Sequence, residues 1–227
     1  MEKKKIFKVL IVLITSIAIV MLVTTFLLDT TGKINQGNFR VNDVVLESKL
    51  DIVQKQEEQV SELSNMLLDI SQENTLSLLI ANNLEIKEAN ITNIKIDTPV
   101  KLGSMYIKQS SQDKVYDITN ETVVNIYPEE KDEQYYIELN IVNENCLTDV
   151  NVPSNTNVVT FDGTILELLN QKYEDYKFTV SFDLNLYDIA GNKNTCKIKL
   201  KLPDQDLYVN GMSIKRDDLS NYIFSIK

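Results

Sequence analysis

Residues that could do chemistry are sparse in this chain of 227 residues. His is absent, which removes the side chain that most often acts as a general base or a zinc ligand. The sequence contains no Gly-rich phosphate loop, nucleophile elbow or CxxC pair. Catalysis by carboxylates, or by Ser and Lys, is the chemistry that this composition leaves open. We therefore expect a non-enzymatic chain with no catalytic residues, no cofactor and no metal site.

Three oxygen-bearing side chains lie close together at Asp188, Asn192 and Asn194. They could contribute to a Ca²⁺ site, but the terminal Glu of an EF-type loop is missing. The pattern Asp-x-x-Gly-Asn is also ordinary turn chemistry, because Asp and Asn side chains bond to nearby backbone groups. The stretch therefore favours a turn over a metal site.

Cys146 and Cys196 are the two thiols of the chain. In an oxidising compartment, an even pair of cysteines fits a disulfide. Cys196 is also in phase with the apolar residues Ile198, Leu200 and Leu202, so it fits a small buried residue equally well. Both interpretations stay open, whereas zinc or catalytic use of this pair is not expected.

The elements that would position these residues are β-strands, because the apolar period is two from Leu84 onward. Turn signals separate candidate strands at 84–86, 91–96, Ser104–Lys108, Lys114–Ile118, Thr122–Tyr127 and Tyr135–Ile141. The acidic run 129–133 indicates a solvated loop. Strands at this spacing predict an all-β sandwich or barrel. Thr164–Gln171 fits a helix by composition and a strand by position.

The clearest pattern lies between Phe178 and Leu202. Apolar residues alternate with polar ones up to Leu186, and again from Cys196, where the polar positions are Lys197, Lys199 and Lys201. Two strands in this phase predict an antiparallel hairpin with one face in the core and one in water.

The same stretch resembles bacterial immunoglobulin-like surface domains, whose last two strands often read Y-x-F-x-V, then D-x-A-G-N and an alternating strand. The matching residues are Tyr176, Phe178, Val180, Asp188, Ala190, Gly191 and Asn192. The resemblance implies an immunoglobulin-like antiparallel sandwich over residues 83–203, with Tyr176 at the position of a tyrosine corner and 161–169 as the preceding strand. It covers about 40 residues and implies adhesion or scaffolding only loosely, because a fold does not determine function. Cys146 and Cys196 depart from the usual immunoglobulin bridge.

Residues 204–227 continue beyond that domain as a β extension. Asn210-Gly211 predicts a type I′ turn between 207–209 and 212–214, and 222–226 fits one more strand. These strands could extend a sheet, cover an edge, or dock on a neighbour by strand addition.

Residues 42–82 have a different spacing and predict a long helix. Apolar residues recur in steps of three and four, as in the seam of a coiled coil, at Leu46, Leu50, Val53, Val60, Leu63, Leu67 and Ile70. One interpretation is a stalk that joins copies of the chain through this seam. The other is an amphipathic helix that packs on its own β domain.

The first 41 residues predict a membrane anchor. Residues 9–28 carry no charge and are nearly all apolar, which is long enough for a helix across a hydrocarbon core of roughly 30 Å. The basic tail 1–8 precedes them, and Asp29 and the short linker 29–41 follow, so the N-terminus should stay cytoplasmic. A cleaved signal peptide fits less well, because the run is longer than a typical h-region and no A-x-A-like site follows.

Composition limits the partners of the remaining chain. The net charge is −10 although residues 1–8 are basic, so the part beyond the membrane is acidic and has no electrostatic reason to bind nucleic acid. Abundant Asn, Ile and Lys suggest AT-rich coding, as in a low-GC bacterium.

We expect a single-pass protein of the bacterial cell membrane that presents its C-terminal domain outside the bilayer to other envelope proteins. The alternatives are a scaffold subunit of an envelope machine, of the pilus or cell-wall type, and an ectodomain that binds a ligand or uses carboxylates for catalysis.

Overall fold

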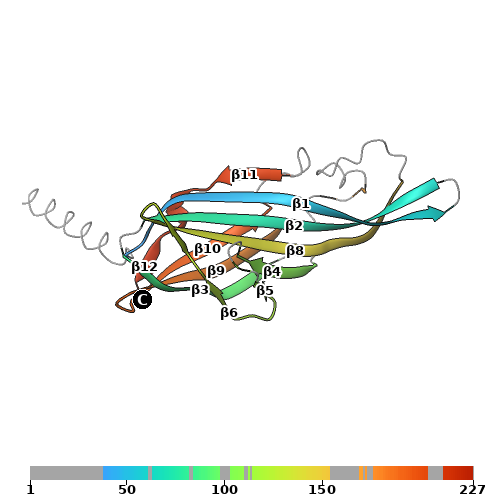
Figure 1. The fold of residues 1–227 in the computed structure, drawn as a ribbon. Helices are drawn as coiled ribbons and strands as arrows, with labels where there is room; N and C mark the ends of the chain where they lie inside the picture. The colour runs from blue at the N-terminus through green and yellow to red at the C-terminus, as the bar shows by residue number, and fades with distance from the viewer. Residues whose placement is uncertain are drawn as a thin grey trace, which may run out of the picture. The chain divides into compact units, whose positions relative to one another are not determined.

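Alternating apolar and polar residues build two antiparallel β-sheets in the computed structural model (Figure 1). The structure describes residues 38–60, 63–81, 84–97, 103–109, 112, 114–153, 169–170, 172, 176–203 and 212–226. In these ranges the chain forms twelve strands and the short 3₁₀ helix η2 (Leu219–Asn221), but no α-helix.

Sheet A has seven strands in the order β11-β1-β2-β8-β4-β5, with β7 beside β8. Three of them are long: β1 (Arg40–Val60), β2 (Leu63–Ala81) and β8 (Gln134–Pro153). The other strands are β4 (Ser104–Lys108), β5 (Val115–Asp117), β7 (Glu129–Lys131) and β11 (Met212–Arg216).

Sheet B has five strands in the order β12-β10-β9-β3-β6. They are β3 (Ile86–Asp97), β6 (Val123–Ile126), β9 (Phe178–Asp188), β10 (Lys193–Leu202) and β12 (Phe224–Ile226). Figure 1 shows that the strands of the two sheets run in broadly the same direction.

One hydrophobic cluster, here called the main core, joins the inner faces of the two sheets. Sheet A contributes Val44, Leu46, Leu76, Leu78, Ile80, Ile107, Ile137, Leu139 and Ile141, and sheet B contributes Ile91, Val124, Phe178, Val180, Phe182, Leu184, Ile198 and Leu200. The outer faces of the two sheets therefore point away from each other.

A second cluster lies farther along the long strands of sheet A. This distal cluster contains Leu68, Ile70, Cys146, Val152 and Tyr176. Between the two clusters, the inner face of sheet A carries a polar belt of four buried residues, Ser48, Gln72, Asn74 and Asn143.

Hydrogen bonds satisfy this belt. The Ser48 hydroxyl donates to Asn74 Oδ1 over 2.7 Å, and Asn74 Nδ2 donates to the Ile141 carbonyl over 3.2 Å. Asn143 Nδ2 donates to Gln72 Oε1 over 3.3 Å, and Gln72 Nε2 donates to the Tyr176 carbonyl over 3.2 Å. Buried amides with such partners cost little, whereas unpaired ones would be destabilising.

The helix expected over 42–82 is wrong, because these residues form the hairpin of β1 and β2. The inward positions of β2 are Leu68, Ile70, Gln72, Asn74, Leu76, Leu78 and Ile80, which is a period of two. Ser48 takes an inward position between Leu46 and Leu50, and Val53 and Leu67 lie on the opposite face, so apolar residues of both faces together step by three and four. No coiled coil is present in the described residues.

The seven seam residues consequently share no face. Leu46 lies in the main core, Ile70 lies in the distal cluster, and Leu50 packs against that cluster. Val53 is 53% exposed and Leu67 is half-buried. Val60 and Leu63 pair with each other at the end of the hairpin.

The described residues also show no boundary between a stalk and a β domain at 82/83. Val44, Leu46 and Leu76 are part of the main core, so the β domain includes residues 42–82. All described residues belong to one compact unit, Gly37–Lys227.

Most strands predicted after Leu84 are confirmed. Ser104–Lys108 is β4, and the strands expected near 115, 123, 135, 178 and 196 correspond to β5, β6, β8, β9 and β10. The hairpin of β9 and β10 has the expected phase, with Leu202 opposite Phe178 and Lys193 opposite Tyr187. The acidic run 129–133 is part of a hairpin, because Glu129–Lys131 pairs with the start of β8.

The C-terminal residues extend both sheets. β11 pairs with residues 45–49 of β1, and β12 pairs with residues 194–196 of β10. The first strand of the expected 207–214 hairpin and the ambiguous stretch Thr164–Gln171 fall largely outside the described residues, as does 161–169.

No helix in the described part of the chain is long and apolar enough to cross a bilayer. Residues 9–28 lie outside the described residues, so the membrane anchor stays a prediction.

Candidate functional site

The turn after β9 is held by its own side chains. Asp188 Oδ1 accepts a hydrogen bond from the Asn192 amide over 2.8 Å, and Oδ2 accepts one from Asn192 Nδ2 over 2.9 Å. Gly191 has φ +84°, a left-handed conformation that glycine adopts without strain. The side-chain hydrogen bond from Asn192 is the main reason that the pKa of Asp188 lies below its usual value.

This turn also binds Asn38, which lies just before β1. Asn38 Nδ2 donates to Asp188 Oδ2 over 3.3 Å, and the Asn38 amide donates to Asn194 Oδ1 over 2.9 Å. Asp188, Asn192 and Asn194 are thus brought together, but they bind one another and Asn38. The described residues contain no group of three or more carboxylate or thiol ligands suited to a metal ion.

The two cysteines are separate. Cys146 is buried in the distal cluster and Cys196 in the main core, so the two are not joined by a disulfide, and the Cys146 thiol donates a hydrogen bond to the Ile70 carbonyl over 3.2 Å. Burial raises the pKa of Cys196 to about 12, and the nearby charge of Asp183 adds to this effect. At neutral pH Cys196 is a protonated apolar side chain, as its phase with Ile198 predicts.

The most distinctive exposed surface is the outer face of sheet B. Lys197, Lys199 and Lys201 project from β10, and their partners on β9 are Asp183, Ser181 and Thr179. Lys95 of β3 lies opposite Ser181 on the other side of β9. We call Lys95, Lys197, Lys199 and Lys201, with the two hydroxyl residues between them, the lysine face.

The described residues do not neutralise the charges of the lysine face. All four lysines are exposed, and none forms an ion pair with a carboxylate of the described residues. Asp183 accepts a hydrogen bond from Asn93 Nδ2 over 2.9 Å. In the central row, two ammonium groups flank the Ser181 hydroxyl, which suits an anionic group that accepts hydrogen bonds.

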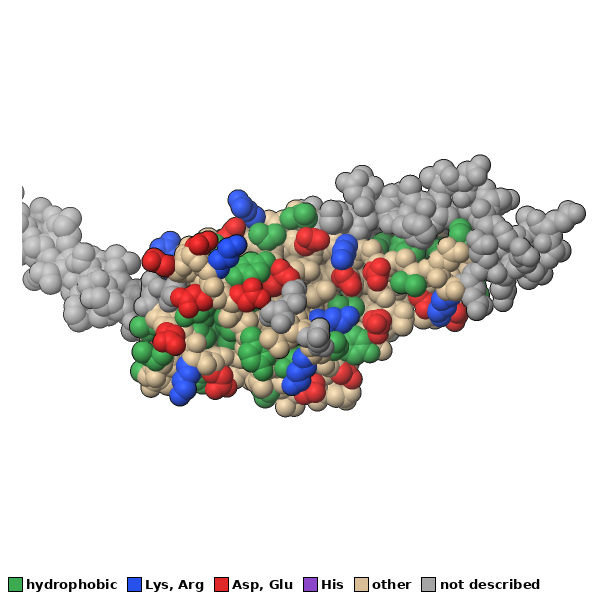
Figure 2. Space-filling view, viewed as in Figure 1, with side chains coloured by type: hydrophobic (Ala, Val, Ile, Leu, Met, Phe, Trp, Pro, Cys, Tyr) green, Lys and Arg blue, Asp and Glu red, His purple; other side chains and the backbone are tan. Residues whose placement is uncertain are grey.

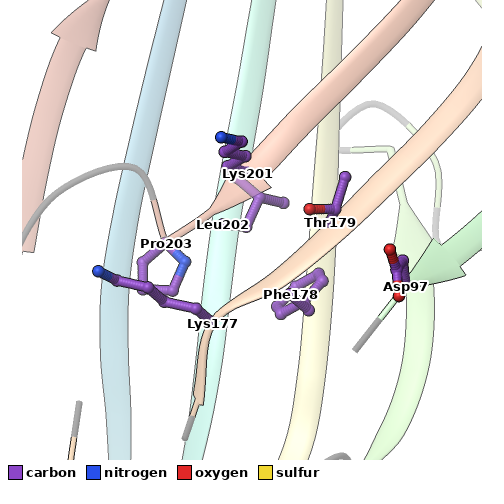
Figure 3. Close-up of a pocket in the computed structure, with 7 residues that line it drawn as sticks. All are labelled: Asp97, Lys177, Phe178, Thr179, Lys201, Leu202 and Pro203. Carbon is purple, nitrogen blue, oxygen red and sulfur yellow. The ribbon is translucent and has the colours of Figure 1, made fainter. Parts of the chain in front are cut away.

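Two shallow hollows lie over this face. One of about 330 Å³ is lined by Lys95, Ser181, Asp183, Lys197 and Lys199, among others. The other, of about 350 Å³, lies where β3 ends and β9 begins (Figure 3). There Lys177, Lys201 and Thr179 supply polar groups, Phe178, Leu202 and Pro203 supply apolar surface, and Asp97 lies at one side.

A row of polar side chains supports the lysine face from within sheet B. Asn185, which is fully buried, donates to Asn90 Oδ1 over 3.0 Å and to Thr92 Oγ1 over 2.9 Å. Thr195 Oγ1 donates to Asn185 Oδ1 over 2.9 Å. These bonds join β3, β9 and β10 on the outer side. Such a network positions the strands that carry the lysines.

The outer face of sheet A has the opposite charge. Glu47 and Asp51 of β1, Glu73 of β2 and Glu138 of β8 lie on it, and we call these four residues the acidic face. Lys49 lies among them and bonds to Glu73 over 2.8 Å. Hydrogen bonding to Glu73 raises the pKa of Lys49 against the effect of burial, and the charges of Glu73, Glu47 and Asp51 raise it further.

One side of the molecule is shown in Figure 2, where acidic side chains are interspersed with lysines over the described surface. The separation of charge lies between particular strands, with the lysine face on β3, β9 and β10 and the acidic face on β1, β2 and β8. Reasoning from sequence identified the alternating lysines of β10. It also placed them on the same outer face as the polar and acidic residues of β9, which the register confirms. It missed that the acidic face belongs to β1, β2 and β8.

Comparison with protein-family models, curated proteins and solved structures finds no match for this chain.

Proposed function

We propose that this chain is a non-enzymatic, single-pass protein of the bacterial cell membrane that presents its β domain outside the bilayer for protein–protein contact. The observation that carries the proposal is the uncharged run 9–28 with lysines on its N-terminal side. The N-terminus would be cytoplasmic and everything after residue 28 extracytoplasmic.

The presented domain is, in this proposal, an immunoglobulin-like sandwich. The strand order supports it: β1-β2-β8-β4 corresponds to the A-B-E-D sheet of a constant-type domain, and β10-β9-β3 to G-F-C. Tyr176 is buried just before β9, which is the position of a tyrosine corner. The departures are β5, β6 and β7 between D and E, and two cysteines that are not joined by a disulfide.

A binding role is favoured over an enzymatic one by the shape and chemistry of the described surface. The hollows on the lysine face are shallow, and each is lined by lysines with a single carboxylate, Asp97 or Asp183. An enzyme that works with a pair of carboxylates needs both of them in one pocket. Four exposed lysines that form no ion pair with a described carboxylate are better suited to an acidic protein surface.

Membrane extraction and protease protection test the location. We expect the chain to stay in the membrane pellet after alkaline carbonate, and a protease added to intact protoplasts to digest residues 84–227. Ile17→Lys/Ile19→Lys should move the chain out of the pellet, because each lysine at a helix centre costs about 3 kcal/mol. Ile17→Leu/Ile19→Leu is the matched control.

A wild-type chain that washes off with carbonate, or a C-terminal domain that protoplasts protect, would refute the proposed location.

The alternative, a scaffold subunit of an envelope machine, is favoured by the opposite charges of the two outer faces. A scaffold requires repeated contacts between copies, and complementary faces on one chain allow such contacts. Loss of an appendage or of cell shape on deletion of the gene would favour this role, and unchanged cells would argue against it.

A further inference from the structure

We propose that copies of this chain stack side by side, with the lysine face of one copy against the acidic face of the next. The inference rests on the proposed membrane location, which gives all copies the same orientation. It replaces the helical seam as the route to a homo-oligomer.

The first support is the charge on each face. Lys95, Lys197, Lys199 and Lys201 have no ion pair with a described carboxylate, so a partner's carboxylates can reach them. On the acidic face, Glu47, Asp51 and Glu73 surround the ammonium group of Lys49. Two further cations lie on the outer side of sheet A, Lys108 opposite Asn140 and Arg216 opposite Val45, and Arg216 is 3.4 Å from Asp43. Complementary charges of this kind select a partner and fix its register.

The second support is that the two faces lie at the same distance, measured along the strands, from the Asn38 end of the domain. Glu47 is seven residues from Arg40 along β1, and Ser181 is seven residues from Asp188 along β9. Both counts start at the same end of the domain, where Asn38 bonds to Asp188. At ~3.3 Å per residue, both faces are centred roughly 23 Å from that end. Copies with a common orientation can therefore meet without a vertical shift.

Counting residues along the strands also argues against a second acidic segment, the hairpin 129–133, as the partner of the lysine face. The exposed hairpin residues Glu129, Glu130, Asp132 and Glu133 lie next to Gln134, which is in register with Ala81 and Arg40. This hairpin is thus near the Asn38 end of the domain, whereas the lysine face is centred roughly 23 Å from that end. It could reach that face of a neighbour only if the two copies were oriented differently.

The available area reaches the low end of a standard interface, about 600 Å² on each partner. The five strands of sheet B have 12, 11, 10, 4 and 3 residues, which at ~3.3 Å per residue and ~4.8 Å between strands give an outer face of roughly 630 Å². A standard protein interface buries about 800 Å² on each partner. The two faces lie on opposite sides of the domain, so the contact is head-to-tail and continues as a row of copies.

Carbodiimide crosslinking of the full-length chain in membranes tests the proposal, because it joins an amine to a carboxylate that touches it. We expect a ladder of dimers and higher oligomers that weakens at high salt. Lys197→Glu/Lys199→Glu and, separately, Glu47→Lys/Asp51→Lys should each lower the yield about tenfold or more, since like charges would then face each other. Lys87→Glu/Lys131→Glu changes the same number of exposed lysines elsewhere and should have no such effect.

Mixing the two variants provides the decisive observation. The lysine-face variant keeps an intact acidic face, and the acidic-face variant keeps an intact lysine face, so co-expression regenerates one wild-type interface. We expect crosslinked dimers that contain one copy of each variant, identified by tags of different size.

Three outcomes overturn the stacking proposal: a wild-type chain that is in the membrane but yields only monomer, a ladder that both face variants preserve, or crosslinks solely to another protein. If the wild-type chain is not in the membrane pellet, the proposed function itself fails. The fractionation of the same samples distinguishes the two cases.

Discussion

The main core and the distal cluster are built from the same long strands but are covered differently. The main core lies between two sheets, so apolar residues of β9, β10 and β3 oppose those of β2 and β8. Among the described residues the distal cluster is smaller: β2 and β8 supply four buried side chains, and Tyr176 supplies the fifth. Among these residues, a main-core side chain therefore has apolar neighbours from two sheets, whereas a distal one has them from a single sheet and Tyr176.

The polar belt divides the two clusters. Ser48, Gln72, Asn74 and Asn143 interrupt the apolar inner face of sheet A, although the strands themselves are continuous. Amide groups between two apolar clusters reduce the packing that would couple them. We therefore expect the distal cluster to open at lower free energy than the main core, as a local unfolding unit.

Truncation in the main core should have the largest effect. Leu78 is fully buried between the sheets, and Leu78→Ala should lower the free energy of unfolding by about 2–5 kcal/mol. Urea unfolding of the full-length chain in detergent measures this loss. Val53→Ala, at a side chain that is 53% exposed, should change it by less than about 0.5 kcal/mol. Equal effects at the two positions would contradict the assignment of the core.

Removing an amide from the polar belt should have the next largest effect. Asn74→Ala deletes the acceptor of the Ser48 hydroxyl and a donor to Ile141, which should cost about 1–3 kcal/mol. Ser48→Ala/Asn74→Leu removes both polar partners and should cost less than the single change. If the double variant is the less stable of the two in urea, the belt is not a hydrogen-bonded unit.

The two cysteines provide a direct test of the comparison, because each cluster contains one of them. At urea concentrations below the main transition, we expect a maleimide to modify Cys146 faster than Cys196. Ile70→Ala should raise the rate at Cys146 several-fold and leave Cys196 unchanged, and mass spectrometry of the peptides measures both rates. Identical rates at every urea concentration would mean that the two clusters open as one unit.

The sequence predicted the elements that pack against a purely apolar partner. β9 and β10 alternate without interruption, because every inward residue from Phe178 to Leu186 and from Cys196 to Leu202 meets the main core. β4 is confirmed at both ends, and β5 and β6 are found within a residue or two of their predicted limits. An apolar period of two is sufficient to predict a strand when one of its faces is buried in an apolar core and the other is exposed to solvent.

Prediction failed where inward residues are polar or where a turn uses unusual residues. In β1 and β2, Ser48 points inward between Leu46 and Leu50, and Val53 and Leu67 lie on the other face, so apolar residues of both faces together imitated a helical seam. The hairpin of β7 and β8 turns at Asp132 and Glu133, with φ of +51° and +59°, where Asn-Gly would be the usual signal. The acidic face was missed for the first reason, since it depends on β1 and β2 being strands.

The smallest expected effect concerns acidification, which should weaken the two ends of the domain through different carboxylates. Near the Asn38 end, the hydrogen bond from the Asn192 side chain lowers the pKa of Asp188. At the distal end, burial alone would raise the pKa of Asp69, but hydrogen bonds from Lys55 and the Asp149 amide lower it. A lowered pKa means that each carboxylate adds stability above the unfolded pKa of about 4, and that this stability is lost as pH falls through the lower folded value.

We therefore expect hydrogen exchange near Cys146 and near Cys196 to speed up as the pH falls below about 4, after correction for the intrinsic rate. Asp69→Asn should flatten this pH dependence near Cys146 alone, because Lys55 joins Asp69 of β2 to Asp149 of β8 on that part of the sheet. Asp188→Asn should flatten it near Cys196 alone, because Asp188 joins the turn before β10 to Asn38. If either variant alters both regions equally, the polar belt does not separate them, and the domain unfolds in acid as a single unit.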